Sequence, residues 1–231
     1  MVTDALLVTL KTNAIAMALI LLIGTPTAYL LGRRRFRGRV FALTLVELPL
    51  VLPPAVAGIG LLAAFGRVGL LGTPIDWLGL QITFSQIAVV MAITFVASPF
   101  YLRQGIASFE ALDQNLVDAA RTLGAPPSRV FFRVALPLAL SGLGAGAALA
   151  FARGIGEFGA TIMFAGSLQG VTQTLSLAIY EQFDLDFDVA LTISALLVVV
   201  SAMILLAVKL RPAWTRSEST SPSPFARLTS S

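Results

Sequence analysis

Cysteine and histidine are both absent from this chain of 231 residues. Without cysteine the protein has no disulfide framework, no thiolate nucleophile and no thiolate metal site. Without histidine it also lacks the commonest metal ligand and general base. We therefore predict no metal site. An enzyme is disfavoured, because the apolar runs hold no cluster of acidic residues to replace these groups.

Charged residues are scarce as well. They make up 12% of the chain, whereas hydrophobic residues make up 57% and the mean hydropathy is +0.88. A soluble domain keeps roughly a quarter of its residues charged, so the composition predicts a membrane protein. The formal net charge of +4 does not indicate nucleic-acid binding, because the cations flank apolar runs and form no basic domain.

Lysine occurs only at Lys11 and Lys209, and neither residue follows a glycine. The phosphate-binding Walker loop requires Gly-Lys followed by Ser or Thr. The chain is therefore not predicted to hydrolyse ATP itself.

Long uncharged runs are the main positive feature of the sequence. A helix needs about 20 apolar residues to cross the hydrocarbon core, and five spans are predicted at about 8–32, 46–66, 82–102, 136–158 and 189–209. A sixth run, 158–180, is rich in glycine and polar residues, so we assign it to an outer loop that lies along or dips into the membrane. The fold class is all-α, with a polytopic membrane domain at 1–211 and a disordered tail at 212–231.

The arginines set the predicted direction of the spans, because short loops rich in Lys and Arg stay in the cytoplasm. Five arginines lie between Arg33 and Arg39, directly after the first apolar run. A cleavable signal peptide has its positive charge before the apolar core, so this run is predicted to be a retained span. Five spans then place the N-terminus outside, and the loop 103–136 and the C-terminus in the cytoplasm.

Two places in the apolar runs are unusual. Pro49, Pro53 and Pro54 cannot all lie in one straight helix. The alternatives are a kinked helix beside a translocation path, or a span that starts near Pro53. Arg153 and Glu157 are four residues apart and are predicted to share a face of the fourth span. They either offer Arg153 to an anion near the outer mouth or, as we favour, neutralise each other at the interface.

Hydroxyl side chains within the apolar runs have two interpretations. Thr94, Ser98 and Thr161 could line a polar path across the membrane. They could equally bond only the backbone of their own helices, and we favour this second interpretation.

The cytoplasmic loop carries a helical pattern followed by stop signals. An apolar stripe recurs at helical spacing over Leu112, Leu116, Ala119, Ala120 and Leu123. Gly124 suits a left-handed helix stop, and Pro126 and Pro127 prevent continuation. A second short turn at 128–132 and a new membrane helix that starts at Pro137 are then predicted. The small alanines would allow a partner to approach closely. The alternative is an amphipathic helix that rests on the membrane surface.

This loop resembles the EAA loop of importer permeases of the ABC transporter superfamily. The resemblance rests on the spacing of Asp118, Ala119, Ala120, Gly124, Val134, Leu136 and Pro137. The family usually has Glu at the first position and Ile before Leu-Pro, so Asp118 and Val134 are conservative departures. The resemblance implies a type I ABC importer permease fold in which these residues form a coupling helix that docks on an ATPase.

Other segments resemble the oxyanion permeases more narrowly. They are Gly24-Thr-Pro-Thr-Ala-Tyr-Leu-Leu-Gly, the stretch from Leu48 to Gly58, and Ala152-Arg-Gly-Ile-Gly-Glu-Phe-Gly-Ala-Thr161. Ala165-Gly166 and Thr172–Tyr180 are similar to the permease subunit of molybdate importers. Because sulfate permeases share the Gly-Glu-aromatic-Gly pattern, sulfate and tungstate remain alternatives to molybdate. An ATP-independent channel or carrier remains the alternative class.

The resemblance also implies partners for the chain. It implies a homodimer in the inner membrane, two cytoplasmic ATPase subunits that hold ATP and Mg, and an extracytoplasmic binding protein that delivers molybdate. No cofactor is expected on this chain itself. The candidate pathway residues are Pro53, Pro54, Ser98, Arg153, Glu157 and Thr161.

Overall fold

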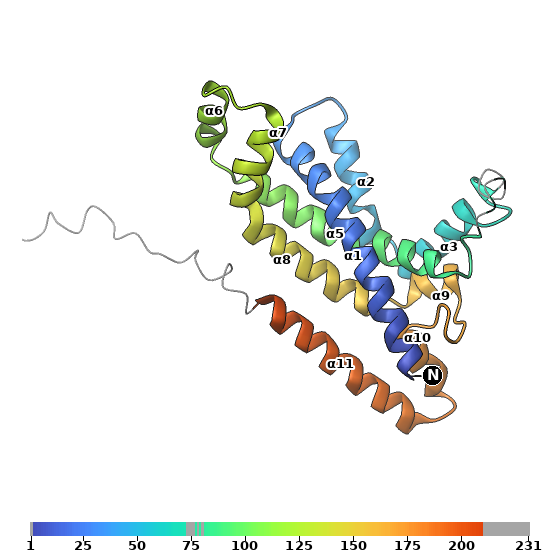
Figure 1. The fold of residues 1–231 in the computed structure, drawn as a ribbon. Coiled ribbons are helices and arrows are strands. Elements are labelled where there is room, and N and C mark those ends of the chain that lie inside the picture. The colour runs from blue at the N-terminus through green and yellow to red at the C-terminus, as the bar shows by residue number, and fades with distance from the viewer. Residues whose placement is uncertain (1, 73–76, 78, 80, 210–231) are drawn as a thin grey trace, which may run out of the picture.

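The computed structural model describes residues 2–72, 77, 79 and 81–209, and this part of the chain contains helices and no strand. Four helices are long (Figure 1): α1 (Val2–Arg33), α5 (Gln86–Glu110), α8 (Leu136–Ile155) and α11 (Phe187–Lys209). Shorter elements connect them: α2 (Arg39–Val51), α3 (Pro54–Phe65), α6 (Gln114–Thr122), α7 (Pro127–Val130), the π-helix η1 (Phe131–Ala135), α9 (Gly159–Ala165) and α10 (Leu175–Phe183). The predicted disordered tail, 212–231, lies outside the described residues.

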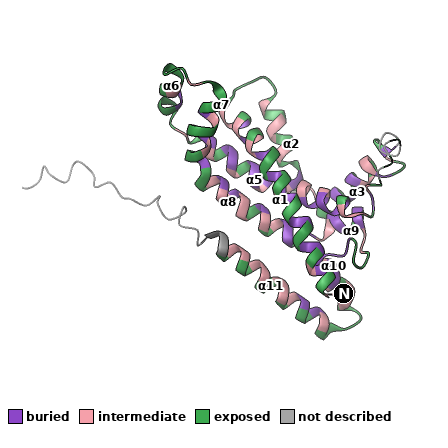
Figure 2. Cartoon of the chain, viewed as in Figure 1, coloured by how far each residue is buried: buried purple, intermediate pink, exposed green. Residues whose placement is uncertain are grey.

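Helix α5 lies at the centre of the molecule and packs against α1 and α8. Small residues bring these helices close together. A Cβ atom at Gly105 of α5 would lie 2.9 Å from the Cβ of Ala28 on α1, and one at Gly146 of α8 would lie 3.2 Å from the Tyr101 carbonyl oxygen. Tyr101 itself is only 1% exposed, and its hydroxyl lies 2.6 Å from Thr25 Oγ1. Figure 2 shows the buried residues gathered along α5 and the faces that meet it.

Four helical runs are long and apolar enough to cross a membrane: Val2–Arg33, Gln86–Glu110, Pro127–Ile155 and Phe187–Leu206. The pair α2 and α3 supplies a fifth crossing if it is taken as one bent span. The predicted all-α polytopic membrane fold is therefore confirmed. The helices are longer than the predicted spans, since α1 begins at residue 2 and α5 continues two turns beyond residue 102.

The second predicted span, 46–66, is not one continuous helix. The chain bends by 118° between α2 and α3. A residue that precedes proline is pushed out of the helical region, and this rule applies twice in succession here. Leu52 (φ −70°, ψ 132°) precedes Pro53, and Pro53 (φ −54°, ψ 136°) precedes Pro54, which starts α3. Helix α3 starts at Pro54, near the expected start at Pro53, and the preceding residues form a separate helix, α2.

The helix of the fourth predicted span begins ten residues before the predicted start at Pro137. Helix α7, η1 and α8 follow one another without a break from Pro127 to Ile155. Proline has no N–H and its ring collides with the carbonyl of residue i−4. The wider π turn just before Pro137, in which Leu136 N–H donates to the Phe131 carbonyl, lets the helix continue past the proline.

The sixth apolar run forms two short helices that are too short to span a membrane. Helix α9 has 7 residues and α10 has 9. Gly166 separates them with φ +67°. The amide of Leu175, at the start of α10, donates to Thr9 Oγ1 of α1 at 2.8 Å, and α10 also packs on α11. These contacts place the segment beside the N-terminal end of α1.

Candidate functional site

A side chain caps the start of helix α6, and a backbone turn caps its end. The Asp113 carboxylate accepts a hydrogen bond from Asn115 N–H at 2.9 Å, which satisfies one free donor of the first turn. At the other end Gly124 has φ +79°. Gly124 N–H donates to the Arg121 carbonyl and Ala125 N–H donates to the Ala120 carbonyl. This is the Schellman arrangement, so the predicted left-handed stop is present.

One face of α6 is buried and the other is free. Val117 is buried, whereas Leu123 is 88% exposed, Leu116 is 49% exposed and Ala119 is exposed as well. Helix α6 lies at one end of the molecule, beyond the ends of α5 and α8 (Figure 1). The Asp118 carboxylate is held on the exposed side by Gln114 at 3.0 Å and Arg121 at 3.3 Å. The outward face is thus a compact apolar surface with a fixed acid beside it.

The base of α6 is joined to the end of α1, and α6 also packs on α7 and η1. Arg33, at the end of α1, donates to the Leu112 carbonyl at 3.3 Å and also to Gln114. The ring of Tyr29 on α1 lies 5.3 Å from that of Phe109 on α5 and 4.8 Å from that of Phe131 on η1. The rings hold α1, α5 and η1 together, and η1 is an element on which α6 packs.

The predicted loop residues beyond Gly124 lie in the continuous helix that leads into α8. Val134 and Leu136 are half-buried, and Pro137 is exposed. Leu136 packs on the core shared by α1, α5 and α8. The seven residues of the predicted EAA loop therefore lie on two elements, α6 with its stop and the η1–α8 junction, that pack against each other.

Arg153 and Glu157 form an ion pair with an N–O distance of 2.6 Å. Glu157 is not on the fourth span as predicted, because α8 ends at Ile155 and Gly156 caps it. The Glu157 side chain is only 1% exposed, and its second oxygen accepts from Ala160 N–H at 2.7 Å. The carboxylate thus joins the end of α8 to the start of α9. This arrangement is the neutralising pair that we favoured, and the pair is more deeply buried than a surface pair.

Removal of the Arg153 charge is expected to destabilise the protein. Arg153→Leu leaves a buried carboxylate without its cation, which costs about 3 kcal/mol. The double variant Arg153→Leu/Glu157→Gln keeps the acceptor for Ala160 and removes the unpaired charge, so most of the stability should return. Thermal unfolding of the detergent-solubilised proteins measures both. Equal melting temperatures for the single and double variants would contradict a charge-based role.

The segment between α9 and α10 contains a polar cluster that the sequence analysis did not single out. The Gln173 amide donates to the Glu181 carboxylate and, at 3.5 Å, to the Ser167 hydroxyl. Thr172 Oγ1 accepts from Leu168 N–H at 2.9 Å. Gln and Thr within an apolar run were a visible signal, but their partners depend on how the 166–174 turn folds. The role of Thr9 could not be predicted from the sequence, since the residue that it contacts in α10 lies 166 residues further along the chain.

The Pro53–Pro54 bend packs directly against the start of α9. A Cβ atom on Gly159 would lie 2.7 Å from the Pro54 Cβ, and one on Gly58 would lie 2.6 Å from the Ala160 carbonyl oxygen. The structure thus brings together two predicted pathway segments about 100 residues apart, Pro53–Pro54 and 157–161.

The hydroxyl groups of Thr94, Ser98 and Thr161 differ in their hydrogen bonding. Ser98 bonds the Phe95 carbonyl of its own helix at 3.4 Å, as we favoured. The hydroxyls of Thr94 and Thr161 are buried and contact no donor or acceptor within the described part of the chain.

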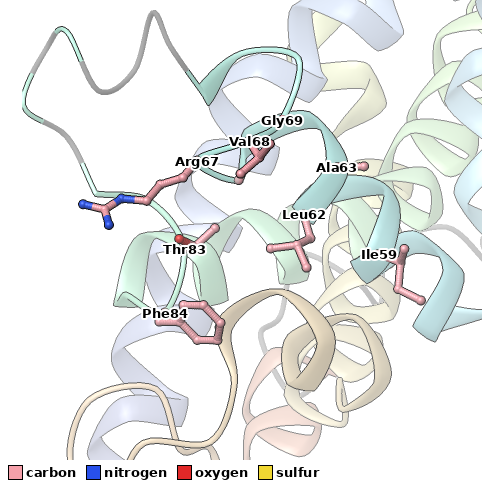
Figure 3. Close-up of a pocket in the computed structure, with 9 residues that line it drawn as sticks. Ile59, Leu62, Ala63, Arg67, Val68, Gly69, Thr83 and Phe84 are labelled. Atoms are coloured by element: carbon pink, nitrogen blue, oxygen red, sulfur yellow. The ribbon is translucent and has the colours of Figure 1, made fainter.

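A hollow of about 470 Å³ lies at the far end of α3 and is lined by Ile59, Leu62, Ala63, Gly66, Arg67, Val68, Gly69, Thr83 and Phe84 (Figure 3). Its wall is mostly apolar. The guanidinium of Arg67 points away from Leu62 and Ile59 (Figure 3). Among the residues that the structure describes, the lining of the hollow has no convergent set of donors for an oxyanion, and we do not assign it as an anion site.

The chain belongs to the family of binding-protein-dependent transport system inner membrane components, whose model matches residues 24–210. It is similar to the molybdenum transport system permease protein ModB of Mycobacterium tuberculosis (strain ATCC 25618 / H37Rv), with 50% identity over 209 residues, 90% of this chain and 78% of the relative. The ModB protein of Escherichia coli (strain K12) is 42% identical over 178 residues, 77% of this chain and 78% of the relative.

Solved structures share the fold at lower identity. A chain of a bacterial alginate ABC transporter, crystallised with an alginate pentasaccharide-bound periplasmic protein, superposes with a TM-score of 0.71 at 16% identity and covers 90% of this chain and 76% of its own. A chain of the inward-facing MetNI methionine ABC transporter superposes with a TM-score of 0.66 at 21% identity and covers 90% and 91%. The fold is therefore that of ABC importer permeases.

Proposed function

We propose that this chain is the permease subunit of an ATP-driven importer for molybdate. The observation that carries the proposal is 50% identity to a molybdenum transport permease over 209 residues, 90% of this chain. Tungstate and sulfate have the same charge and tetrahedral shape, so they remain the alternative cargoes. The anion is the cargo of the machine and is not expected to stay on the chain.

Helix α6 is proposed as the coupling helix, with two copies of the chain docking on two ATPase subunits. The exposed Leu116, Ala119 and Leu123 support this role, because an apolar helix face fits a groove on a partner. ATP and Mg would be held by the ATPases, since neither lysine of this chain lies in a Gly-Lys-Ser/Thr sequence. ATP-driven closure of the ATPases would move α6, and its bond with Arg33 of α1 and its packing on η1 would pass the motion to the spans.

The proposed orientation has α6 and the C-terminus in the cytoplasm and the N-terminus outside. Two observations support it. The five arginines of 33–39 and helix α6 lie at the same end of the molecule, as the Arg33–Leu112 bond requires. Basic segments stay in the cytoplasm. Helix α11 runs in the same general direction as α1, so its C-terminal end points toward that end (Figure 1).

The pathway is proposed to pass the Pro53–Pro54 bend and the 157–161 segment, where a second copy would complete the wall. Arg153 is already paired with Glu157, so this site offers little net charge to an anion. Weak attraction of the anion to this segment would allow the anion to be released rapidly. Selectivity for the anion would then belong mainly to the extracytoplasmic binding protein.

The test is ATP hydrolysis and uptake of radiolabelled anion by the complex reconstituted in vesicles. The binding protein is added with molybdate, tungstate or sulfate in turn. We expect molybdate to stimulate both activities and sulfate to have little effect. Stimulation by sulfate alone would support an ATP-driven importer but would identify sulfate, and not molybdate, as its cargo. Uptake without ATP, and no association with an ATPase, would instead establish a channel or carrier.

A further inference from the structure

The arginine cluster at the end of α1 contains more cations than the fold uses. Arg33 bonds the base of α6, and Arg39 pairs with Glu110 and donates to the Leu31 carbonyl. For Arg34, Arg35 and Arg37 no ion pair with a carboxylate is recorded within the residues that the structure describes, and all three are exposed. Three guanidinium groups next to a membrane span therefore remain available to an anionic partner.

An apolar groove lies directly beside one of these arginines. It has a volume of about 340 Å³ and is lined by Thr27, Leu30, Leu31, Arg34 and Phe36. Arg34 is its one charged group. The Thr27 hydroxyl bonds the Ile23 carbonyl of its own helix at 2.7 Å, so it does not make the wall strongly polar. The lining of the groove is thus mostly apolar, and the Arg34 guanidinium is the charged group in it.

The groove faces away from the protein core. Ile23, Thr27, Leu30 and Arg34 follow one another at spacings of three and four residues and so share one face of α1. Ile23 is 61% exposed and Leu30 is 46% exposed, whereas Ala28 on the neighbouring face is buried against α5. An outward apolar face on a membrane span that ends in an arginine meets both the acyl chains and the headgroups of the lipid layer.

We propose that this groove is a binding site for an anionic phospholipid of the cytoplasmic leaflet. An acyl chain would lie along Ile23, Thr27 and Leu30, and the phosphate would accept hydrogen bonds from Arg34. Guanidinium groups bind phosphate through two parallel hydrogen bonds, and basic residues at the cytoplasmic end of a span attract anionic lipids. A free phosphate would leave the apolar wall uncovered, which is why the structure favours a lipid. The site concerns the lipid around the permease and does not depend on which anion is transported.

The experiment is native mass spectrometry of the full-length chain, released from detergent after exchange with defined lipids. Phosphatidylglycerol and phosphatidylcholine with identical acyl chains are compared, so that only the headgroup charge differs. We expect phosphatidylglycerol to be retained preferentially. Arg34→Gln should reduce its retention about fivefold, the effect of one basic residue near an anionic surface.

Two further variants distinguish a specific lipid site from unspecific electrostatic attraction of the lipid to the arginine cluster. Arg37→Gln removes the same charge from the same cluster, but Arg37 does not line the groove, so its effect should be clearly smaller. Thr27→Phe fills the groove and leaves every arginine in place, and it should reduce retention of phosphatidylglycerol as Arg34→Gln does. Each variant is first checked for monodispersity and helix content.

Several outcomes would overturn the proposal. Equal losses from Arg34→Gln and Arg37→Gln would mean unspecific surface attraction, and equal retention of both lipids would mean an apolar groove without headgroup recognition. Displacement of phosphatidylglycerol by inorganic phosphate would assign the site to a free anion. Displacement by the purified ATPase subunit would assign it to a protein partner. None of these outcomes bears on the proposed transport activity, which is measured separately.

Discussion

Gly124→Val is expected to reduce ATP-driven anion uptake strongly while the protein still inserts in the membrane and folds. Gly124 ends α6 with φ +79°, a conformation that costs a non-glycine residue about 1–3 kcal/mol and that a β-branched side chain tolerates worst. A Cβ atom there would meet nothing within 4 Å. The strain therefore affects the turn after α6 and leaves the packing of the core unchanged.

The size of the effect follows from the need to restore this turn on docking. If α6 must adopt the native stop to fit the ATPase, that strain weakens docking roughly five- to hundredfold. Uptake into vesicles, ATP hydrolysis and co-purification of the ATPase measure the loss. Gly124→Asn is the matched control, because asparagine tolerates the left-handed region, and it should retain most of the activity. Normal uptake by the Gly124→Val variant would contradict the coupling role of α6.

Gly58→Ala is expected to separate α3 from α9 and to destabilise the bent second span. The new Cβ would lie 2.6 Å from the Ala160 carbonyl oxygen and 2.9 Å from the Ala160 Cα. Backbone atoms cannot swing aside as the end of a side chain can. Overpacking of this kind costs about 1–3 kcal/mol, and the Pro54–Gly159 contact beside it would open as well.

Gly60→Ala provides the control on the same helix. A Cβ on Gly60 would meet nothing within 4 Å, and alanine is the better helix former by up to about 1 kcal/mol. Thermal unfolding in detergent should therefore show a lower melting temperature for Gly58→Ala and an equal or higher one for Gly60→Ala. If the two variants behave alike, the close packing of α3 on α9 does not support the bend.

Features that depend on neighbours in the chain were predictable. The all-α membrane fold followed from long uncharged runs, and the short helix before Gly124 followed from an apolar stripe, a glycine and two prolines. The bend at Pro53 was open to the same local reasoning, since the residue before each proline is driven out of the helix. The helical start at residue 127 was missed, because a π turn can accommodate Pro137.

Features that depend on distant residues were not predictable. The sequence placed Glu157 on a helix face with Arg153, but the carboxylate lies beyond the end of α8 and caps α9. No local pattern pairs Thr9 with Leu175, or Gly58 with Ala160, because these contacts depend on how separate helices are arranged in space.

The sequence by itself determined the class of the molecule, the number of apolar runs and the position of the exposed helix α6. The reason is that hydropathy, caps and prolines act within a few residues of their own position. Only the tertiary structure decided that α6 is tied to α1 through Arg33 and packs on η1, that the proline bend rests on α9, and that a groove beside Arg34 faces outward. These features arise from close packing between helices far apart in the chain, where the fit of one side chain depends on the position of every neighbour.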